Sequence, residues 1–138
     1  MSLLLGFTAV FAAGLWYTQF YAFYEEIEAE RVTIAGTEYP VEAFQGIDAG
    51  TSPLKLRACF RLPEAPEAPV YERAEPLVAP GWFECFDAED IAIDLNAGRA
   101  TAYLAAPDDA TGADRVVVRY PDGRAFMWRQ LTEEYAEQ

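Results

Sequence analysis

The chain has 138 residues, of which 10 are basic and 23 are acidic, and it contains two cysteines and no histidine. Without histidine, this chain alone builds neither Ser-His-Asp nor Cys-His catalysis, nor His-ligated haem, nor the usual catalytic zinc site. A formal net charge of −13, one lysine and singly scattered glycines argue against a nucleic-acid or nucleotide site. We therefore expect a protein that is not an enzyme and holds no cofactor or metal.

Residues 2–24 carry no charged side chain. As a helix, this stretch would extend roughly 34 Å at about 1.5 Å per residue, enough to cross a hydrocarbon core of about 30 Å. Aromatic rings gather toward its end, and such rings are enriched where a membrane meets water. The sequence therefore predicts a transmembrane helix whose membrane-interface residues are Trp16, Tyr17, Phe20, Tyr21 and Tyr24.

Two other interpretations of this stretch compete with the transmembrane one. A cleaved signal peptide usually starts with a basic segment, but no lysine or arginine precedes Arg31. A buried core helix is rarely apolar all round, and the remaining chain is too small to enclose one. We therefore divide the chain into an anchor helix with an acidic exit, residues 1–30, and an extramembrane domain, residues 31–138.

Every charged side chain follows residue 24, so the extramembrane part carries the whole net charge. Four glutamates come directly after the apolar stretch, and a leaflet rich in anionic lipid would repel them. These are Glu25, Glu26, Glu28 and Glu30. The positive-inside rule gives little guidance here, because Arg31 is the only basic side chain near the stretch.

Cys59 and Cys85 each lie beside a phenylalanine, and a proline-rich segment that can fold back separates them. Zinc needs four ligands, which two cysteines without histidine do not supply. The pattern favours one disulfide, and the alternative is two buried reduced thiols in a cytosolic domain. Because a disulfide forms in an oxidising compartment, we expect a single-pass protein of the bacterial inner membrane with its C-terminal domain in the periplasm.

The first half of the domain is predicted to contain short strands. Residues 32–34 and 38–41 suggest a hairpin, and residues 43–53 are rich in turn formers. Residues 54–62 alternate strictly, which predicts a strand with one apolar face. We expect the basic side chains of its other face, which should point outward, to pair with acidic ones on a neighbouring strand. The alternative is a contact with an anion or an acidic partner. This outer face carries Lys55, Arg57, Cys59 and Arg61.

Prolines between residues 63 and 69 predict an exposed extended loop, because each removes a backbone donor. Residues 70–74 are a further candidate strand. The apolar cluster at residues 80–86 is expected to pack a core against the disulfide. In the alternative interpretation this cluster is an exposed docking patch, with Trp82 and Phe83 as the candidate partner contacts.

One helix is predicted in the domain, over residues 88–97. Asp87 is a good N-cap, acidic residues fill the first turn, and Gly98 suits the C′ position. Residues 99–106 then return as a strand.

The domain is predicted to end in a hairpin. Residues 114–120 and 124–131 flank a turn of proline, aspartate and glycine at residues 121–123. The polar tail of residues 132–138 is expected to be frayed or loosely helical. The fold class is thus α+β: an N-terminal transmembrane helix followed by a small, mainly antiparallel β domain with one helix.

Four segments carry a family resemblance, namely Tyr21–Glu26, Arg57–Phe60, Pro80–Ala88 and Asp114–Val117. Through them the chain resembles, over nearly its whole length, an uncharacterised domain-of-unknown-function family of small single-pass membrane proteins with a periplasmic domain, found in alphaproteobacteria. The resemblance implies an anchor and a periplasmic domain. It implies no reaction, cofactor or partner, because the family has none assigned.

The function expected from these features is that of a non-catalytic accessory or assembly subunit. Its helix would pack against an integral membrane complex of the respiratory or photosynthetic electron-transfer type. Its acidic domain would attract a basic partner such as a c-type cytochrome. The alternative is a membrane-tethered periplasmic enzyme or small-molecule-binding module, working through carboxylates, tyrosine and arginine in a cleft.

Overall fold

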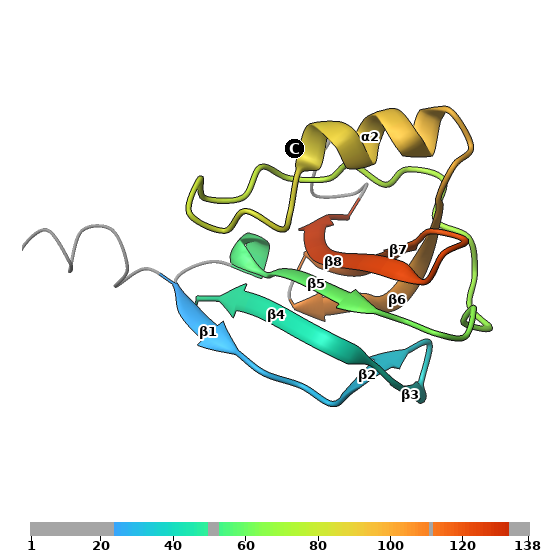
Figure 1. Cartoon of the computed structure of the whole chain (residues 1–138), viewed down its shortest axis with the longest axis horizontal. Coiled ribbons are helices and arrows are strands. Elements are labelled where there is room, and N and C mark those ends of the chain that lie inside the picture. Colours follow the sequence, from blue (N-terminus) through green and yellow to red (C-terminus); the bar gives the residue numbers. More distant parts are fainter. Residues whose placement is uncertain (1–23, 50–52, 111, 133–138) are drawn as a thin grey trace, which may run out of the picture.

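A six-stranded antiparallel sheet with a helix across one face forms the body of the molecule (Figure 1). The computed structural model describes residues 24–49, 53–110 and 112–132. The strand order is β1-β4-β5-β8-β7-β6, and β2 and β3 form a separate two-stranded sheet. The elements are β1 Glu25–Ile27, β2 Arg31–Ile34, β3 Thr37–Pro40, β4 Glu42–Asp48, η1 Pro53–Lys55, β5 Arg57–Arg61, α2 Ala88–Asn96, β6 Thr101–Ala110, β7 Ala113–Arg119 and β8 Arg124–Leu131.

Both faces of the large sheet are covered, as the centre of β7 shows. Val116, Val117 and Val118 are all fully buried, although successive strand residues point to opposite faces. Val116 and Val118 belong to a core that includes Ile91 of α2. Val117 belongs to a second core on the other face, which includes Ile34 of β2. The helix and the small sheet therefore each close one face.

Within the described residues, the prediction of a small, mainly antiparallel β domain with one helix is confirmed. The backbone N–H of Asp90 donates to Asp87 Oδ1, as expected of an N-cap, and Gly98 has a φ of 77° at the other end of α2. Both predicted hairpins form. The first is β2 and β3, and the second is β7 and β8 around the turn at residues 121–123.

The prediction of a turn-rich segment at residues 43–53 is wrong, because β4 runs through Glu42–Asp48. A register shift between Glu42 and Gln45, with Ala43 at a φ of 53°, breaks the alternation that would have marked this strand. Residues 70–74 form no full strand, and only an isolated bridge joins Val70 to Tyr103.

The strand predicted over residues 54–62 forms only in part, as β5, and the prediction of an outward face on it is wrong. A short 3-10 turn occupies Pro53–Lys55, and β5 begins only at Arg57. The face expected to be outward is covered, so that Arg57 is 5% and Cys59 8% exposed. The cause is the long connection from β5 to α2, which folds back over this face of the sheet (Figure 1).

The predicted transmembrane helix falls on residues 2–24, of which only Tyr24 is among the described residues. Between residues 24 and 132, in the parts that the structure describes, no helix has the length and apolar character needed to cross a membrane. Apart from Thr132, the predicted tail also lies outside the described residues.

Candidate functional site

The predicted disulfide between Cys59 and Cys85 is confirmed. Their sulfur atoms are 2.17 Å apart and their Cα atoms 6.3 Å apart. Cys59 lies in β5, at the centre of the sheet, and Cys85 lies in the irregular segment just before α2. The bridge therefore ties the long connection to the sheet near the end of that connection.

Arg57 fixes the same connection by hydrogen bonds. Its guanidinium donates from Nε to the carbonyl oxygen of Leu77 at 3.0 Å and from Nη2 to that of Val78 at 3.1 Å. Nη1 donates to the carbonyl oxygens of Leu54 and Leu56, at 2.5 and 2.6 Å. Burial lowers the pKa of this arginine. The expected pairing with an acidic side chain is therefore wrong for Arg57, which binds backbone carbonyls instead.

The other basic side chains of that predicted face, Arg61 and Lys55, have contacts in other parts of the domain. Arg61 donates from Nη2 to the carbonyl oxygen of Asp122 at 2.8 Å. Lys55 places its Nζ 5.4 Å from the centre of the Tyr24 ring. Arg57, Arg61 and Lys55 thus contact three different parts of the domain and do not form one basic stripe.

The segment fixed by Arg57 and Cys85 includes residues 77–83, which we call the 77–83 loop. The side chain of Val78, which we call the tip of the loop because it is the most exposed of the loop's large apolar side chains, is 82% exposed. The loop closes with a tight turn, in which the backbone N–H of Phe83 donates to the carbonyl oxygen of Pro80 at 2.9 Å. In Figure 1 this part of the connection reaches the same end of the molecule as the start of β1.

Trp82 and Phe83, the two candidate partner contacts, are both partly buried, with ring centroids 6.3 Å apart. Phe83 packs against the core beneath α2. Trp82 meets Tyr24 edge to face, with centroids 5.8 Å apart. We call Tyr24, Lys55, Trp82 and Phe83 the junction cluster. Of the predicted membrane-interface residues, Tyr24 belongs to this cluster, and Trp16, Tyr17, Phe20 and Tyr21 lie outside the described residues.

A shallow open groove of about 430 Å³ runs beside the junction cluster, between the 77–83 loop and the start of α2. Its loop side is apolar and includes Val78 and Phe83, whereas its helix side carries Glu84, Asp87 and Glu89. The groove thus has one apolar wall and one acidic wall.

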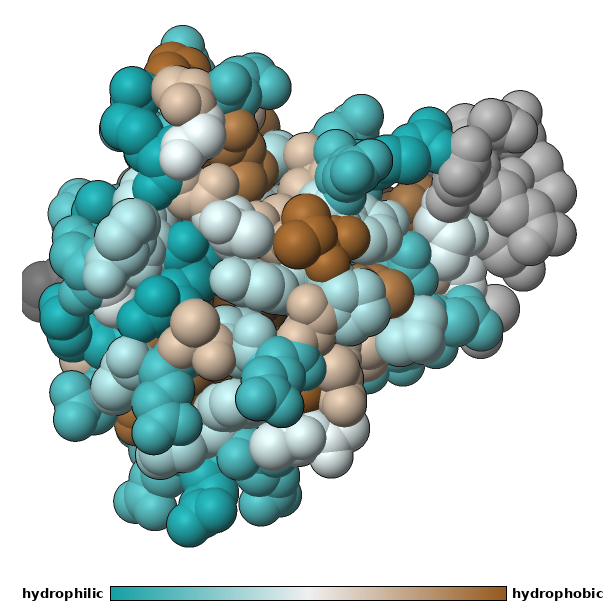
Figure 2. All heavy atoms as spheres, turned by 90° about the vertical axis from the view of Figure 1, so that its right-hand side faces the viewer, coloured by the Kyte–Doolittle hydropathy of each residue, from teal (hydrophilic) through white to brown (hydrophobic). Residues whose placement is uncertain are grey.

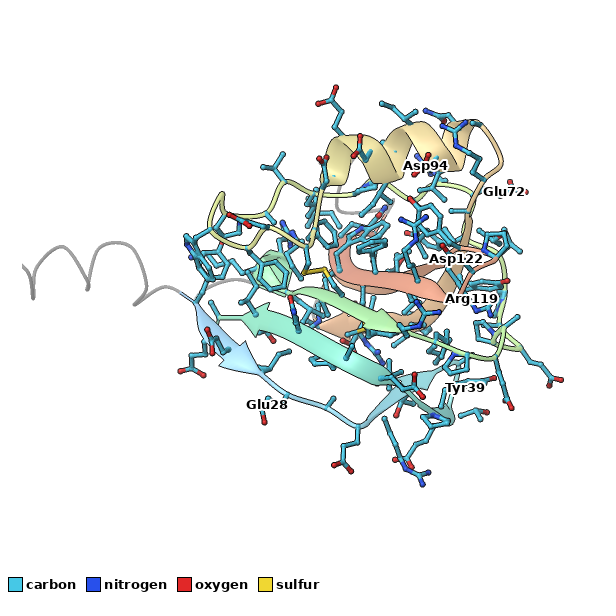
Figure 3. All side chains as sticks on the ribbon, in the orientation of Figure 1. Glu28, Tyr39, Glu72, Asp94, Arg119 and Asp122 are labelled. Atoms are coloured by element: carbon cyan, nitrogen blue, oxygen red, sulfur yellow. A yellow bond between two sulfur atoms is a disulfide. The ribbon has the colours of Figure 1, made fainter. Side chains whose placement is uncertain are left out.

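The first edge strand of the sheet is acidic. Glu25 and Glu26 of β1 are exposed, as are Glu28 and Glu30 just after it. In Figure 3, Glu28 points away from the sheet into solvent. In the sequence, this acidic edge begins directly after Tyr24 of the junction cluster.

Basic groups, by contrast, are largely engaged within the domain. Arg99 pairs with Asp94, Arg124 with Asp122, and Arg119 donates to the backbone carbonyl of Leu62. With 23 acidic against 10 basic residues, negative charge dominates the field outside the domain.

A second feature lies on the sheet face opposite α2. Arg115 of β7 and Arg129 of β8 are paired across the strands, and Asp109 lies between them. The Asp109 carboxylate accepts from Arg115 Nε at 3.2 Å and from Arg129 Nε at 2.8 Å. Asp48 lies 3.4 Å from Arg129 Nη1. Burial lowers the pKa of Arg115, and the charge of Asp109 opposes that shift.

Arg115, Arg129 and Asp48 line a hollow of about 280 Å³. Its other walls combine apolar side chains, Phe44 and Met127 among them, with polar ones such as Glu28 and Arg31. The side chains of Arg115 and Arg129 are only 13% and 21% exposed. This hollow could not be predicted from the sequence, because the pairing of Arg115 with Arg129 depends on the register of β7 and β8. Among the described residues, no three His, Cys, Asp or Glu side chains gather in a way that would hold a metal ion.

Comparison with known proteins identifies one family. A model described as a family of unknown function (DUF6446) matches residues 27–138. The matched range starts at the last residue of β1 and includes all the later strands and α2. No curated protein and no solved structure matches the chain significantly.

Proposed function

We propose that this chain, which belongs to the family of unknown function DUF6446, is a non-catalytic accessory or assembly subunit of an inner-membrane complex. In this proposal residues 2–24 anchor it and the domain lies in the periplasm. The complex is of the respiratory or photosynthetic electron-transfer type, and the partner that the domain meets is basic, such as a c-type cytochrome.

Two features support the location. The Cys59–Cys85 disulfide fits an oxidising compartment such as the periplasm. The uncharged stretch ends at Tyr24, and the first described residues after it are acidic. The resemblance to small single-pass membrane proteins of alphaproteobacteria supports the same arrangement.

The distribution of charge is the observation that carries the proposed role. The net charge is −13, and most of the described arginines contact carbonyl oxygens or carboxylates of the same domain. The exposed glutamates at β1 are therefore available to a cationic surface. Such a field raises encounter rates with basic proteins in a salt-dependent way.

Affinity purification of the tagged full-length protein in mild detergent tests this role. We expect a multi-subunit membrane complex to co-purify, and we expect added salt to weaken the contact of the domain with its basic component. Replacing Glu25, Glu26 and Glu28 by glutamine should weaken that contact in the same way. The matched control replaces Glu64, Glu67 and Glu72, which are also exposed; Figure 3 shows Glu72 at the opposite end of the molecule from Glu28.

Two results would overturn the proposal. One is recovery of the full-length protein without any complex from membranes in which it is native. The other is turnover of a small molecule by the purified protein, abolished without unfolding by the loss of one carboxylate or tyrosine.

A second candidate function, a small-molecule-binding module, is favoured by the hollow at Arg115 and Arg129. It places two largely buried guanidinium groups, which share Asp109, beside apolar side chains such as Phe44 and Met127, and a small carboxylate would bind them in place of Asp109. Titration of the full-length protein with butyrate, and with butan-1-ol as the uncharged match, tests it. Saturable binding of butyrate alone, lost in Arg129→Met and kept in Arg124→Met, would support this candidate, and no saturable binding would remove it.

A further inference from the structure

We propose that the 77–83 loop rests in the headgroup region of a zwitterionic lipid bilayer, so that the domain touches the membrane at a second point beside its anchor. This inference depends on the anchoring in the proposed function. It adds which surface of the domain faces the membrane and what that surface contacts.

The first argument is the chemistry of the loop. An apolar side chain as exposed as Val78, at 82%, gains free energy when it leaves water. The obstacle for any irregular segment at a membrane is its backbone carbonyls, which lose their water partners there. Here the carbonyls of Leu77 and Val78 already accept hydrogen bonds from Arg57. The tip can therefore enter the interface without leaving these two groups unpaired.

The second argument is position. Tyr24 is the last residue of the uncharged stretch in the sequence, and its ring packs against Trp82 of the loop. Wherever residue 24 meets the membrane surface, Trp82 lies beside it. Tyrosine and tryptophan are the side chains that concentrate at the level of the headgroups.

The third argument is the polarity of the two ends of the domain. Figure 2 shows the end opposite the start of β1, where polar side chains predominate and apolar ones form separate spots. At the other end, the 77–83 loop and the junction cluster place an exposed valine next to partly buried aromatic rings. The exposed Val78 thus lies at the same end of the domain as Tyr24, the last residue of the uncharged stretch.

Charge selects the kind of lipid. The groove beside the loop carries Glu84, Asp87 and Glu89 on its other wall, and Glu25 and Glu26 follow Tyr24. An anionic headgroup would be repelled by these carboxylates, whereas a zwitterionic headgroup offers them its cationic part. The bilayer that fits this surface is therefore rich in zwitterionic phospholipid.

The loop is also held rigidly before it meets any lipid. The Cys59–Cys85 bridge and the Arg57 hydrogen bonds fix both of its ends to β5. A surface ordered in advance loses little conformational freedom on binding, so a small apolar tip suffices.

Tryptophan fluorescence of the full-length protein in phosphatidylcholine vesicles tests the proposal. The chain has tryptophans at positions 16, 82 and 128, and Trp128 is fully buried. In the Trp16→Phe protein, phosphatidylcholine brominated near the headgroup should quench the emission of Trp82. In the Trp16→Phe/Trp82→Phe protein, which reports Trp128 alone, the same lipid should quench little.

A second pair of variants leaves the reporter in place. In the Trp16→Phe background, Val78→Asp should reduce the quenching of Trp82, because it puts a charge at the tip. Ile93→Asp is the matched control, since Ile93 is 50% exposed on α2 and does not line the groove beside the loop, and it should leave the quenching unchanged.

Flotation of the same vesicles separates this inference from the proposed function. If the protein does not float with the vesicles, the anchor fails and both proposals fall. If it floats but the brominated lipid does not quench Trp82, the loop does not contact lipid and only this inference falls. If Trp82 is shielded in native membranes but not quenched in pure lipid, the loop binds a protein instead, and the inference is again overturned.

Discussion

Tyr24 and Trp82 meet edge to face, with ring centroids 5.8 Å apart and ring planes 82° apart. Aromatic pairs in this geometry contribute about 1 kcal/mol beyond the area they bury. The contact joins the start of the described chain to a loop that two further devices, a disulfide and a buried arginine, hold to the sheet. The direction in which the chain enters the domain is therefore coupled to the position of the loop.

Among the basic residues of the domain, Arg57 is predicted to be the one whose replacement lowers the stability most. Replacing it by methionine leaves the carbonyl oxygens of Leu77 and Val78 without their donor. We therefore expect the free energy of unfolding to fall by about 3 kcal/mol. Denaturant unfolding of the full-length protein measures this. Arg99→Met is the control, because Arg99 is exposed and its pair with Asp94 should contribute less than about 1 kcal/mol. Equal losses in the two variants would contradict the anchoring role of Arg57.

Reduction of the Cys59–Cys85 bridge should destabilise the protein. The cysteines are 26 residues apart, and closing a loop of that size stabilises by roughly 3 kcal/mol on a chain-entropy estimate. We expect a reductant to lower the denaturation midpoint of the wild type and to leave that of a Cys59→Ala/Cys85→Ala variant unchanged. Two free thiols in protein prepared without reductant would show that the bridge does not form.

Gly46 is predicted to tolerate no side chain. A Cβ at this position would lie 2.6 Å from Cε1 of Phe44 and 2.7 Å from Cγ1 of Ile27, which is its partner in β1. We expect Gly46→Ala to cost about 1–3 kcal/mol of stability and to loosen β1, seen as faster amide exchange at Ile27. Gly81→Ala is the control, because nothing lies within 4 Å of its Cβ position. Similar stability in both variants would refute the crowding at β4.

Tyr71 gives the protein a pH dependence at the alkaline end. Burial, and then the hydrogen bond that its hydroxyl donates to Asp114, raise its pKa to about 12. The folded state thus holds this proton more tightly than the unfolded chain, where tyrosine titrates near pH 10. The resulting stability is complete below about pH 10 and is lost as the pH rises toward 12.

Asp114→Asn separates the two causes of that shift. Without the carboxylate, we expect the phenol of Tyr71 to titrate at lower pH, closer to an ordinary tyrosine, in an absorbance titration of the phenolate. Tyr71→Phe should remove this transition from the titration. An unchanged alkaline transition in the asparagine variant would show that Asp114 does not raise the pKa.

The local elements of this fold could be predicted from sequence because each has its own signal. Asp87 and Gly98 mark the ends of α2, and the turn at residues 121–123 marks the last hairpin. The disulfide could be predicted because a chain with two cysteines offers one pairing.

What could not be predicted depends on contacts between distant segments. Alternation along β5 indicates one buried face. The connection from β5 to α2 covers the second face, but it has no regular sequence pattern that would predict this. Arg57 was therefore expected to be exposed. β4 was missed because its bulge at Ala43 breaks the alternation. The grouping of Asp109 with Arg115 and Arg129 depends on strand register, which no single segment encodes.

The two edges of the large sheet differ in how they are closed. At β6, the backbone N–H of Leu104 donates to Pro69 and that of Tyr71 donates to Ala102, so a neighbouring segment occupies this edge. At the opposite edge, β1 pairs with β4 on one side and carries Glu25 and Glu26. An open strand edge would let two copies of the chain join their sheets. Like charges at this edge repel the same edge of a second copy, so the acidic edge disfavours polymerisation of the chain through its sheet.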